Sequence, residues 1–435
     1  MTEMWRALSP GMQDALVALL LVAPGILAGA IVLRGLAPRA LVRAMLRRFA
    51  WVNALFVLLI AVSVGVGTGL VAQERGLRQG SARAAEKFDL IVAAPGSELT
   101  AMLAAVYLQP SDMALLSGTQ YAEIAGAEGV DFAAPIAFGD SYQGAPVVGT
   151  TAQFVTHMAG PLAEGRLFAA RDEAVVGAYA PLAPGASFSP AHGEADAAEH
   201  DAHDGVSYRV TGRMAPTGSP WDRAILVPVE GVWAVHGLPD GHAPGDARIG
   251  PPFLSDQIPG TPAVLVRARE VWGNYALKSQ FTRKDMMAFF PGTVLAQLHG
   301  LMREIRSAMS LLAVLSQVLV TLSVLIGLMI LVRLIARSLA VLRAIGAPGR
   351  FVFAVVWSYC AVLIAAGAGM GLGLGWGAAR LLSAVITSRT DVLVTARLGW
   401  NEVHLVAGFI SLTLLLALLP AWAAIRRRLL VDLRG

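Results

Sequence analysis

Long apolar runs without a charged residue alternate with polar segments along this chain of 435 residues. A helix needs about 20 apolar residues to cross the hydrocarbon core of a bilayer. Five runs meet or nearly meet that length, and each predicts a membrane-spanning helix: 15–33, 50–73, 307–332, 351–379 and 405–425. The polar segment 74–306 then forms one large domain outside the bilayer. The chain divides accordingly into an extra N-terminal span with a basic loop (1–49), a second span (50–73), the extramembrane domain (74–306) and a three-span region (307–435).

Shorter patterns within 74–306 predict an α+β domain. Brief apolar or alternating runs predict strands at 88–92, 146–149, 174–177, 206–214, 224–229 and 263–266, and helical spacing predicts helices at 99–107, 152–158 and 271–277. Residues 178–205 and 237–262 are poor in large apolar residues or dense in glycine and proline, and they predict loops. Residues 74–87 and 294–306 contain no proline. We expect them to extend the neighbouring spans as a helical stalk, with ordinary connecting helix as the alternative.

The arginines predict the orientation of the spans. Short loops rich in basic residues stay in the cytoplasm. The loops 34–49 and 333–350 and the tail 426–434 are rich in arginine, whereas 74–306 carries 17 basic against 25 acidic residues. The pattern predicts that the loops and the C-terminus lie inside and that 74–306 and the N-terminus lie outside, as in an inner-membrane protein with a periplasmic domain. The net charge of +4 therefore reflects topology and not nucleic-acid binding.

The sequence lacks the motifs of common enzymes. The three lysines, Lys87, Lys278 and Lys284, do not follow a glycine, so the chain has no nucleotide-binding P-loop. No Gly-x-Ser-x-Gly elbow, His-Glu-x-x-His or Cys-x-x-Cys occurs. With the boundaries given above, no span contains Asp, Glu, Lys, Arg or His, which argues against an ion-coupled carrier. We expect no enzymatic activity in the chain itself and no directly bound cofactor, apart from the zinc considered below.

One cytoplasmic segment, 333–350, has an amphipathic pattern. Its apolar residues recur at helical spacing, arginines occupy other faces, and glycine and proline end the helix. Two interpretations stay open: a helix that lies among lipid headgroups, or a helix that docks a cytoplasmic partner. The residues assigned to docking are Arg337, Leu339, Leu342, Arg343, Ile345 and Gly346. On this interpretation, Leu342→Asp is expected to release the partner.

The stretch from Ser338 to Ala347 resembles the signature loop of FtsX/MacB-type ABC transporter permeases, which include the LolC/LolE-like proteins. In that family one helix precedes a large extracytoplasmic domain, three follow it, and the loop binds a separate ATPase. Residues 50–435 fit that plan. Ser338 stands where the family usually has an acid, and 15–33 has no counterpart in the four-helix plan. The resemblance implies a homodimer, a cytoplasmic ABC ATPase and an extracytoplasmic adaptor or cargo protein.

Short motifs in the extramembrane domain are similar to one branch of uncharacterised permeases in that superfamily, whose members often carry a His-rich loop. The motifs are 88–94, 106–107, 135–136, 139–141, 148–150, 217–220 and 222–223. The branch resemblance does not identify a cargo.

Glycines in the fourth span are spaced four residues apart in two sets. One set is Gly367, Gly371 and Gly375, and the other is Gly369, Gly373 and Gly377. Each set lines up a groove that lets another helix approach closely. The grooves are expected to serve packing within the chain, or one of them a homodimer seam or sliding surface.

A segment rich in histidine and acids follows within 178–205. His192, His200 and His203 alternate there with carboxylates, and imidazole and carboxylate are ligands that suit zinc. The segment is either a zinc site or a solvated acidic loop.

Taken together, these patterns predict a permease subunit that moves its outer domain when a separate ATPase hydrolyses ATP. Two alternatives remain: an FtsX-like signalling protein that activates an extracytoplasmic enzyme, and a zinc-linked transport or sensing protein.

Overall fold

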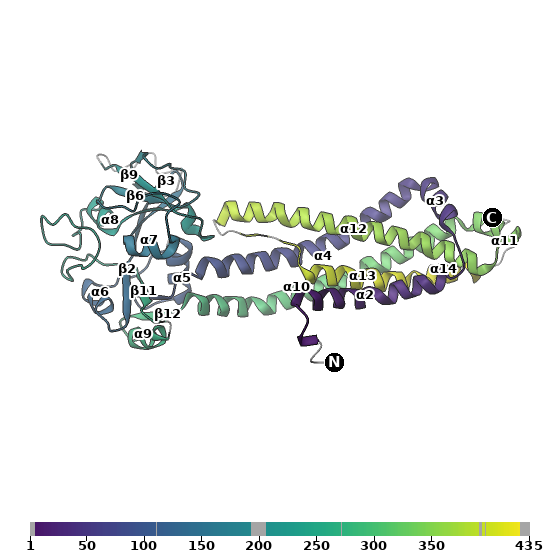
Figure 1. Cartoon of the computed structure of the whole chain (residues 1–435), viewed down its shortest axis with the longest axis horizontal. Helices are drawn as coiled ribbons and strands as arrows, with labels where there is room; N and C mark the ends of the chain where they lie inside the picture. Colours follow the sequence, from purple (N-terminus) through teal and green to yellow (C-terminus); the bar gives the residue numbers. More distant parts are fainter. Residues whose placement is uncertain are drawn as a thin grey trace. The chain divides into compact units, whose positions relative to one another are not determined.

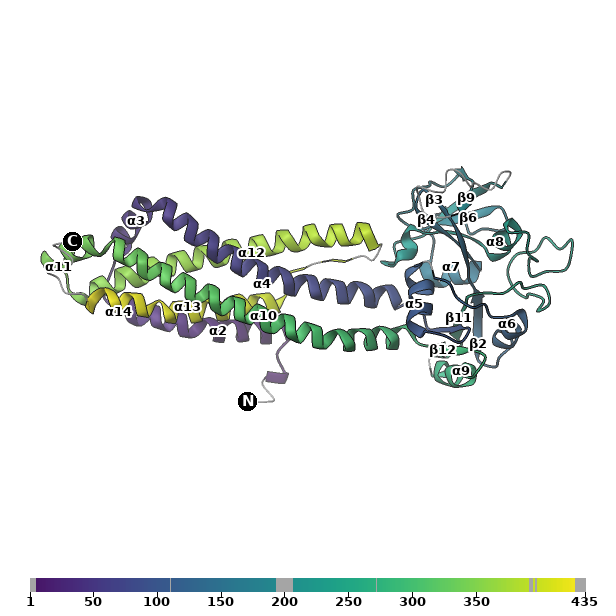
Figure 2. The ribbon, with the colours of Figure 1, turned by 180° about the vertical axis from the view of Figure 1, so that it is seen from behind.

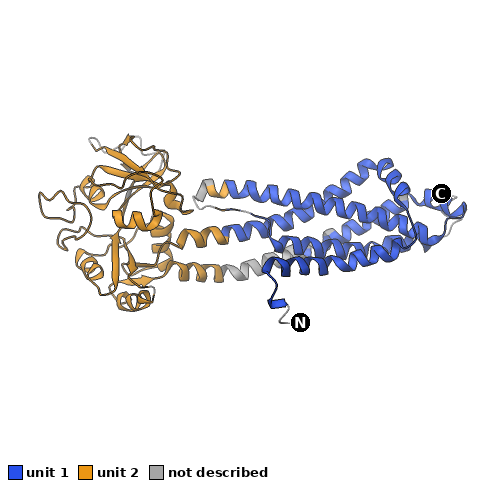
Figure 3. Cartoon of the chain, viewed as in Figure 1, with its two compact units in different colours: residues 1–77, 304–384, 395–435 blue, residues 78–303, 385–394 orange. Residues whose placement is uncertain are grey.

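The computed structural model describes residues 5–109, 111–192, 206–270, 272–390, 394–395 and 397–426. They fall into two compact units (Figure 3). Unit 1 comprises 1–77, 304–384 and 395–435, and unit 2 comprises 78–303 and 385–394. The division agrees with the predicted separation of a membrane region from an α+β domain.

Unit 1 is built of helices (Figure 1). Three of the helices that contribute to it also have residues in unit 2. The helices are α2 (Pro10–Leu33), α3 (Arg39–Arg48), α4 (Ala50–Ala85), α10 (Pro291–Leu334), α11 (Ala336–Ala344), α12 (Gly349–Thr390), α13 (Trp400–Leu416) and α14 (Leu418–Arg426).

Four helices are long and apolar enough to cross a membrane among the residues described. They are Pro10–Leu33, Ala50–Ala85, Gly349–Thr387 and Trp400–Arg426. A fifth crossing is available if Thr321–Arg333 and Ala336–Ala344, which are bent by 50° at their junction, count as one span. The third expected span, 307–332, lies within α10. These helices associate the chain with a membrane.

Apolar side chains of unit 1 are exposed on its surface, and hydrogen bonds and close contacts join its helices. Leu20 of α2 is 65% exposed and Leu55 of α4 is 67% exposed, as expected of lipid-facing positions. The extra helix α2 has a defined packing site: the Gly25 amide donates to Ser411 Oγ at 3.1 Å. A Cβ at Gly29 would lie 2.8 Å from the Trp357 ring, so glycine is needed for this close approach.

Unit 2 contains two β-sheets. The four-stranded sheet is antiparallel throughout, in the order β12-β1-β11-β2. Its strands are β1 (Leu90–Ala93), β2 (Val130–Pro135), β11 (Ala263–Ala268) and β12 (Met287–Phe289). The second sheet has the order β5-β9-β6-β10-β4-β3-β8, with β7 paired to β9. Its strands are β3 (Ala137–Tyr142), β4 (Ala145–Thr150), β5 (Glu164–Gly165), β6 (Glu173–Val176), β7 (Ser187–Phe188), β8 (Ala191–His192), β9 (Tyr208–Arg213) and β10 (Ile225–Pro228).

Short helices pack beside these sheets (Figure 2). They are α5 (Glu98–Tyr107), α6 (Gly118–Ala125), α7 (Ala152–Ala159), the 3₁₀ helix η1 (Pro220–Arg223), α8 (Val229–Val235) and α9 (Gly273–Phe281). Side-chain oxygens cap several of them: Ser117 Oγ accepts from the Gln120 amide at the start of α6, and Thr151 Oγ1 accepts from the Phe154 amide at the start of α7.

A buried aromatic cluster forms part of the core of unit 2. The ring of Phe154 lies 5.9 Å from Phe88 and 5.2 Å from Trp221, and Trp221 is fully buried. The carboxylate of Asp222, the next residue, accepts hydrogen bonds from the amides of Thr217 and Gly218, at 2.8 and 2.7 Å. Residues of the motifs 88–94, 217–220 and 222–223 therefore contribute to this aromatic cluster and to the turn beside it.

Most expected strands and helices of unit 2 are confirmed within one or two residues, except that α9 runs to Phe281. Residues 178–192 differ from the expected loop, since β7 and β8 lie there and Phe188 is 3% exposed. Residues 193–205, including His200 and His203, lie outside the described residues. Several elements were not predicted: α6, β2, β3, α8 and β12. The expected helical extensions are confirmed, because α4 continues to Ala85 and α10 begins at Pro291.

Candidate functional site

The amphipathic helix α11 turns two different faces to its surroundings. Ile335, just before the helix, and Leu339 are 2% and 6% exposed, and they belong to the buried core of unit 1. Leu342 packs against the same core. The opposite face carries Arg337, exposed, with Val341 and Ile345 at 45% and 80% exposure.

This arrangement changes the predicted docking surface. Leu339 and Leu342 support the helix from beneath, so Leu342→Asp would damage packing and is not a clean test of docking. The exposed residues Arg337, Val341 and Ile345 are spaced four apart and lie on one side of the helix. We call these three residues the α11 outer face. The predicted end of the helix at glycine is confirmed: α11 ends at Ala344, and Gly346 has a φ of +103° and is exposed.

Arginine-rich segments gather at one end of unit 1. Arg343 donates to the Ile425 carbonyl in α14 at 3.4 Å, so this predicted docking residue is engaged within the chain. Arg350 donates to the Arg34 carbonyl at 3.5 Å. Helices α3, α11 and α14 lie at this end (Figures 1 and 2). Loops that the arginine pattern predicts on one side of a membrane are thus close together.

The two glycine grooves of α12 are not equivalent. A Cβ at Gly371 would lie 2.6 Å from Val64 Cβ and 2.8 Å from the Ala61 carbonyl oxygen, and one at Gly367 would lie 2.6 Å from Ile60 Cβ. A Cβ at Gly375 would also meet α4, because it would overlap Thr68 Oγ1 and lie 2.8 Å from the Gly65 carbonyl oxygen. This set therefore serves packing of α12 on α4 within the chain.

The second set, Gly369, Gly373 and Gly377, faces open space. A Cβ at any of the three would meet no atom within 4 Å. This set does not pack against another helix of the chain among the described residues, and its role as a homodimer seam or sliding surface stays a prediction.

A buried ion pair joins α4 to the start of α13. Arg75 bonds to Glu402, whose side chain is fully buried, while the Arg75 side chain is 21% exposed. The other carboxylate oxygen of Glu402 accepts from the Gly399 amide at 2.8 Å and caps the helix. Gly399 also leaves the room that Arg75 occupies, because a Cβ there would overlap the guanidinium.

The pair was not predicted from the sequence, because the fifth span was expected at 405–425. The candidate span begins at Trp400 and so contains Glu402 and His404. The statement that no span holds an ionisable residue is therefore wrong. His404 Nε2 lies 2.9 Å from the Asp14 carbonyl oxygen in α2. Both contacts serve helix packing.

Of the three predicted zinc ligands, only His192 lies within the described residues. His192 is the last residue of β8, and its Cα pairs with Asp140 of β3. His200 and His203 lie outside the described residues. Among the side chains that the structure describes, no three His, Cys, Asp or Glu residues group as a metal site.

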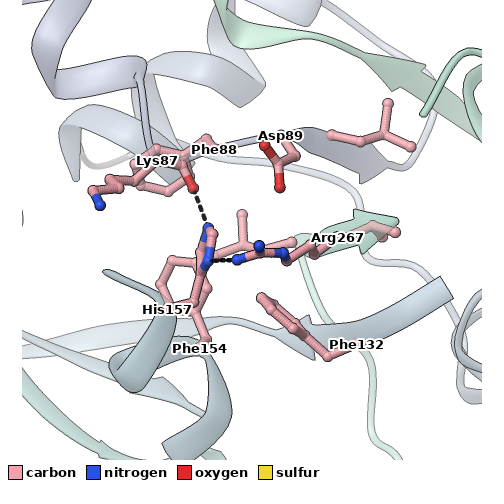
Figure 4. Close-up of a pocket in the computed structure, with 10 residues that line it drawn as sticks. Lys87, Phe88, Asp89, Phe132, Phe154, His157 and Arg267 are labelled. Atoms are coloured by element: carbon pink, nitrogen blue, oxygen red, sulfur yellow. Dashed lines mark hydrogen bonds between the residues drawn. The ribbon is translucent and has the colours of Figure 1, made fainter. Parts of the chain in front are cut away.

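Unit 2 has a small hollow around His157 (Figure 4). His157 Nε2 lies 2.8 Å from the Lys87 carbonyl oxygen, and its Nδ1 contacts the Arg267 guanidinium. The carbonyl can only accept a hydrogen bond, so Nε2 is the ring nitrogen that donates to Lys87. The open volume is about 180 Å³, below the range of about 300–1,000 Å³ for small-molecule sites. The hollow is therefore smaller than a typical small-molecule site, and His157 lies in it between Lys87 and Arg267.

A second buried polar pair lies within unit 2. Glu230 Oε1 and His242 Nε2 are 3.4 Å apart, and the two side chains are 1% and 2% exposed. Burial raises the pKa of Glu230, against the Gly250 amide and His242, which lower it. Both groups are enclosed, and the pair joins Glu230 of α8 to His242 in the loop that follows it.

No family model matches the chain, and no curated protein matches it either.

Proposed function

We propose that the chain is the permease subunit of an FtsX/MacB-type ABC system, driven by a separate cytoplasmic ATPase. The observation that carries the proposal is the α11 outer face. It presents an arginine and two exposed aliphatic side chains at the arginine-rich end of unit 1, while the other side of α11 packs on the core of that unit. A chain without a P-loop needs such a surface to receive work from ATP.

The lengths of three helices support a mechanical role. Helices α4, α10 and α12 contain 36, 44 and 42 residues. At about 1.5 Å per residue, each is longer than the roughly 30 Å hydrocarbon core. Each also has residues in both units. In the proposed mechanism, ATPase closure shifts α11 and the spans, and the continuous helices carry that movement to unit 2.

The proposal places unit 2 in the periplasm of an inner-membrane homodimer. ATP acts only through the partner subunit, and unit 2 acts on an adaptor, a lipoprotein or another cargo outside the bilayer. The acidic balance of 74–306 and the gathered basic loops support this orientation.

A substitution on the α11 outer face tests the docking site. Ile345 is 80% exposed, so Ile345→Asp leaves the core of unit 1 intact and places a charge in the proposed interface. We expect recovery of the co-expressed ATPase to fall at least about tenfold, a loss of about 1.4 kcal/mol. The measurement is co-purification from detergent extract at matched permease levels.

Ile345→Val is the matched control, because it keeps an apolar side chain, and we expect it to retain the ATPase. Equal recovery with Ile345→Asp and with wild type would remove the docking role and leave α11 as an interfacial helix.

A further inference from the structure

A long connection between α8 and β11 packs against other elements of unit 2. Residues 236–262 contain no helix or strand. Connections longer than about 12–15 residues without secondary structure are uncommon in compact domains, and the ordered ones usually serve a function. Two backbone hydrogen bonds close this connection on itself: the Gly241 amide donates to the Gln257 carbonyl at 3.0 Å, and the Leu254 amide donates to the Gly241 carbonyl at 2.8 Å. We call residues 237–257 the strap.

The ring of Phe253 packs the strap onto two helices. Its centroid lies 5.9 Å from Trp233 of α8 and 5.7 Å from Tyr121 of α6. Both of these side chains are buried. Phe253 also lies 5.2 Å from the ring of His242, within the strap itself. Release of the strap would therefore remove Phe253 from α6 and α8 and uncover apolar surface on both helices.

One buried carboxylate anchors the strap to α8. Glu230 Oε1 lies 3.4 Å from His242 Nε2, and the two side chains are 1% and 2% exposed. The same oxygen accepts a hydrogen bond from the Gly250 amide. Both contacts run from Glu230 to the strap, so the strap cannot leave α8 without losing them.

Several other titratable or charged side chains face α8 and the strap. They are Tyr121 of α6, Asp140 of β3, Arg171 before β6, Tyr208 of β9, His236 at the end of α8, and Asp240, Asp246 and Arg248 of the strap. Burial raises the pKa of both tyrosines, so their hydroxyls stay neutral at physiological pH. His236 faces Asp140 and not Glu230.

The acids of the strap have arginine partners. Arg171 lies 2.5 Å from Asp240, and Arg248 lies 2.6 Å from Asp246. Arginine keeps its charge across the pH range in which proteins are folded. The buried carboxylate of Glu230 differs, because its side-chain partner is a histidine, a residue type that changes charge near neutral pH. Among the described ion pairs of the strap, this buried pair is the one whose charge depends on pH there.

The direction of the pH effect follows from the burial of Glu230. Burial raises its pKa above the ordinary value of 4.5, although the Gly250 amide and His242 oppose the rise. A carboxyl group with a raised pKa binds its proton more tightly in the closed state than in an open, hydrated state. The closed state is therefore favoured at low pH, and this contribution is lost as the pH rises through the raised pKa. At higher pH, closure keeps an ionised carboxylate buried, whereas opening hydrates it.

We propose that the strap is a pH-operated cover of α6 and α8, closed while Glu230 and His242 hold a proton between them and open once the pair has lost it. Opening exposes the apolar surface around Trp233 and Tyr121. The cover lies in unit 2 and does not involve the α11 outer face, so it stands or falls separately from ATPase docking.

Hydrogen–deuterium exchange of the full-length protein in detergent tests the cover. The quantity compared is the protection factor of the strap amides, such as those of Gly241, Gly250 and Leu254, which corrects for the pH dependence of intrinsic exchange. We expect this factor to fall at least about tenfold between about pH 5.5 and about pH 8.5, because a pKa shift of about one unit changes the closed-to-open ratio about tenfold. Strands β10 and β11 are the internal reference and should keep their protection.

Glu230→Gln removes the titrating proton but keeps an acceptor for the Gly250 amide and a donor for His242. We expect its strap to be equally protected at both pH values. His236→Gln is the matched control, because it removes the other histidine beside α8, and it should retain the wild-type fall.

An unchanged fall in folded Glu230→Gln would overturn the proposal, as would loss of the fall in His236→Gln. Constant protection of the wild-type strap across this pH range would overturn it whether or not Glu230→Gln folds. Equal loss of protection in β10 and β11 would also overturn it, since the whole of unit 2 would then be opening.

Discussion

Arg75→Ala is expected to cost about 3–5 kcal/mol of stability in detergent, because it leaves the carboxylate of Glu402 buried without its counter-ion. Glu402 is fully enclosed, and its remaining partner, the Gly399 amide, supplies only one hydrogen bond. The residual exposure of Arg75, 21%, favours the lower end of the range. The measurement is the free energy of unfolding in a denaturant titration.

Two controls separate the ion pair from general damage to α4. Arg78→Ala removes an exposed arginine one turn away and is expected to change stability by less than about 0.5 kcal/mol. The double variant Arg75→Met/Glu402→Gln removes both charges and keeps an acceptor for Gly399. It is expected to recover most of the loss, and an Arg75→Ala protein as stable as wild type would show that the pair does not join α4 to α13.

Gly371→Ala is expected to destabilise unit 1 by about 1–3 kcal/mol, through overpacking of α12 against α4. The new methyl group would meet Val64 Cβ at 2.6 Å and the Ala61 carbonyl oxygen at 2.8 Å. Neither atom is the far end of a flexible side chain, so the helices themselves must separate. The same titration measures the effect.

Gly373→Ala is the matched control on the same helix. Its Cβ would meet no atom within 4 Å, and alanine favours a helix over glycine by about 1 kcal/mol. Gly371→Ala should therefore lower the free energy of unfolding, and Gly373→Ala should raise it. Equal effects at the two positions would contradict the packing of Gly371 on α4.

The sequence predicted the elements whose signal is local. Apolar length located the candidate spans, and short apolar or alternating runs located four strands of the second sheet, β4, β6, β9 and β10. Span ends were less predictable, because an uncharged run stops at its first charge. The expected fifth span therefore excluded Glu402, although the candidate span contains it. Its charge is paired there with Arg75 of another helix, which the local sequence does not indicate.

Faces of helices were not predictable for a related reason. Periodicity identified an apolar stripe through Leu339 and Leu342, but only the neighbouring helices determine that this stripe is covered and that Ile345 is exposed. The glycine spacing likewise gave two grooves without indicating that α4 fills the one at Gly371. The pairing of His236 with Asp140 depends on the fold of β3 and α8, and no local pattern encodes it.

In the proposed mechanism, this chain receives work from a separate ATPase. The most direct measurement is ATP hydrolysis by the tagged protein purified in mild detergent from membranes of its own cell. The chain has no P-loop, so the account predicts ATP hydrolysis together with a second polypeptide that carries one, both lost with Ile345→Asp and both retained with Ile345→Val. Purification of the folded chain without any ATPase subunit and without ATP hydrolysis would contradict the account.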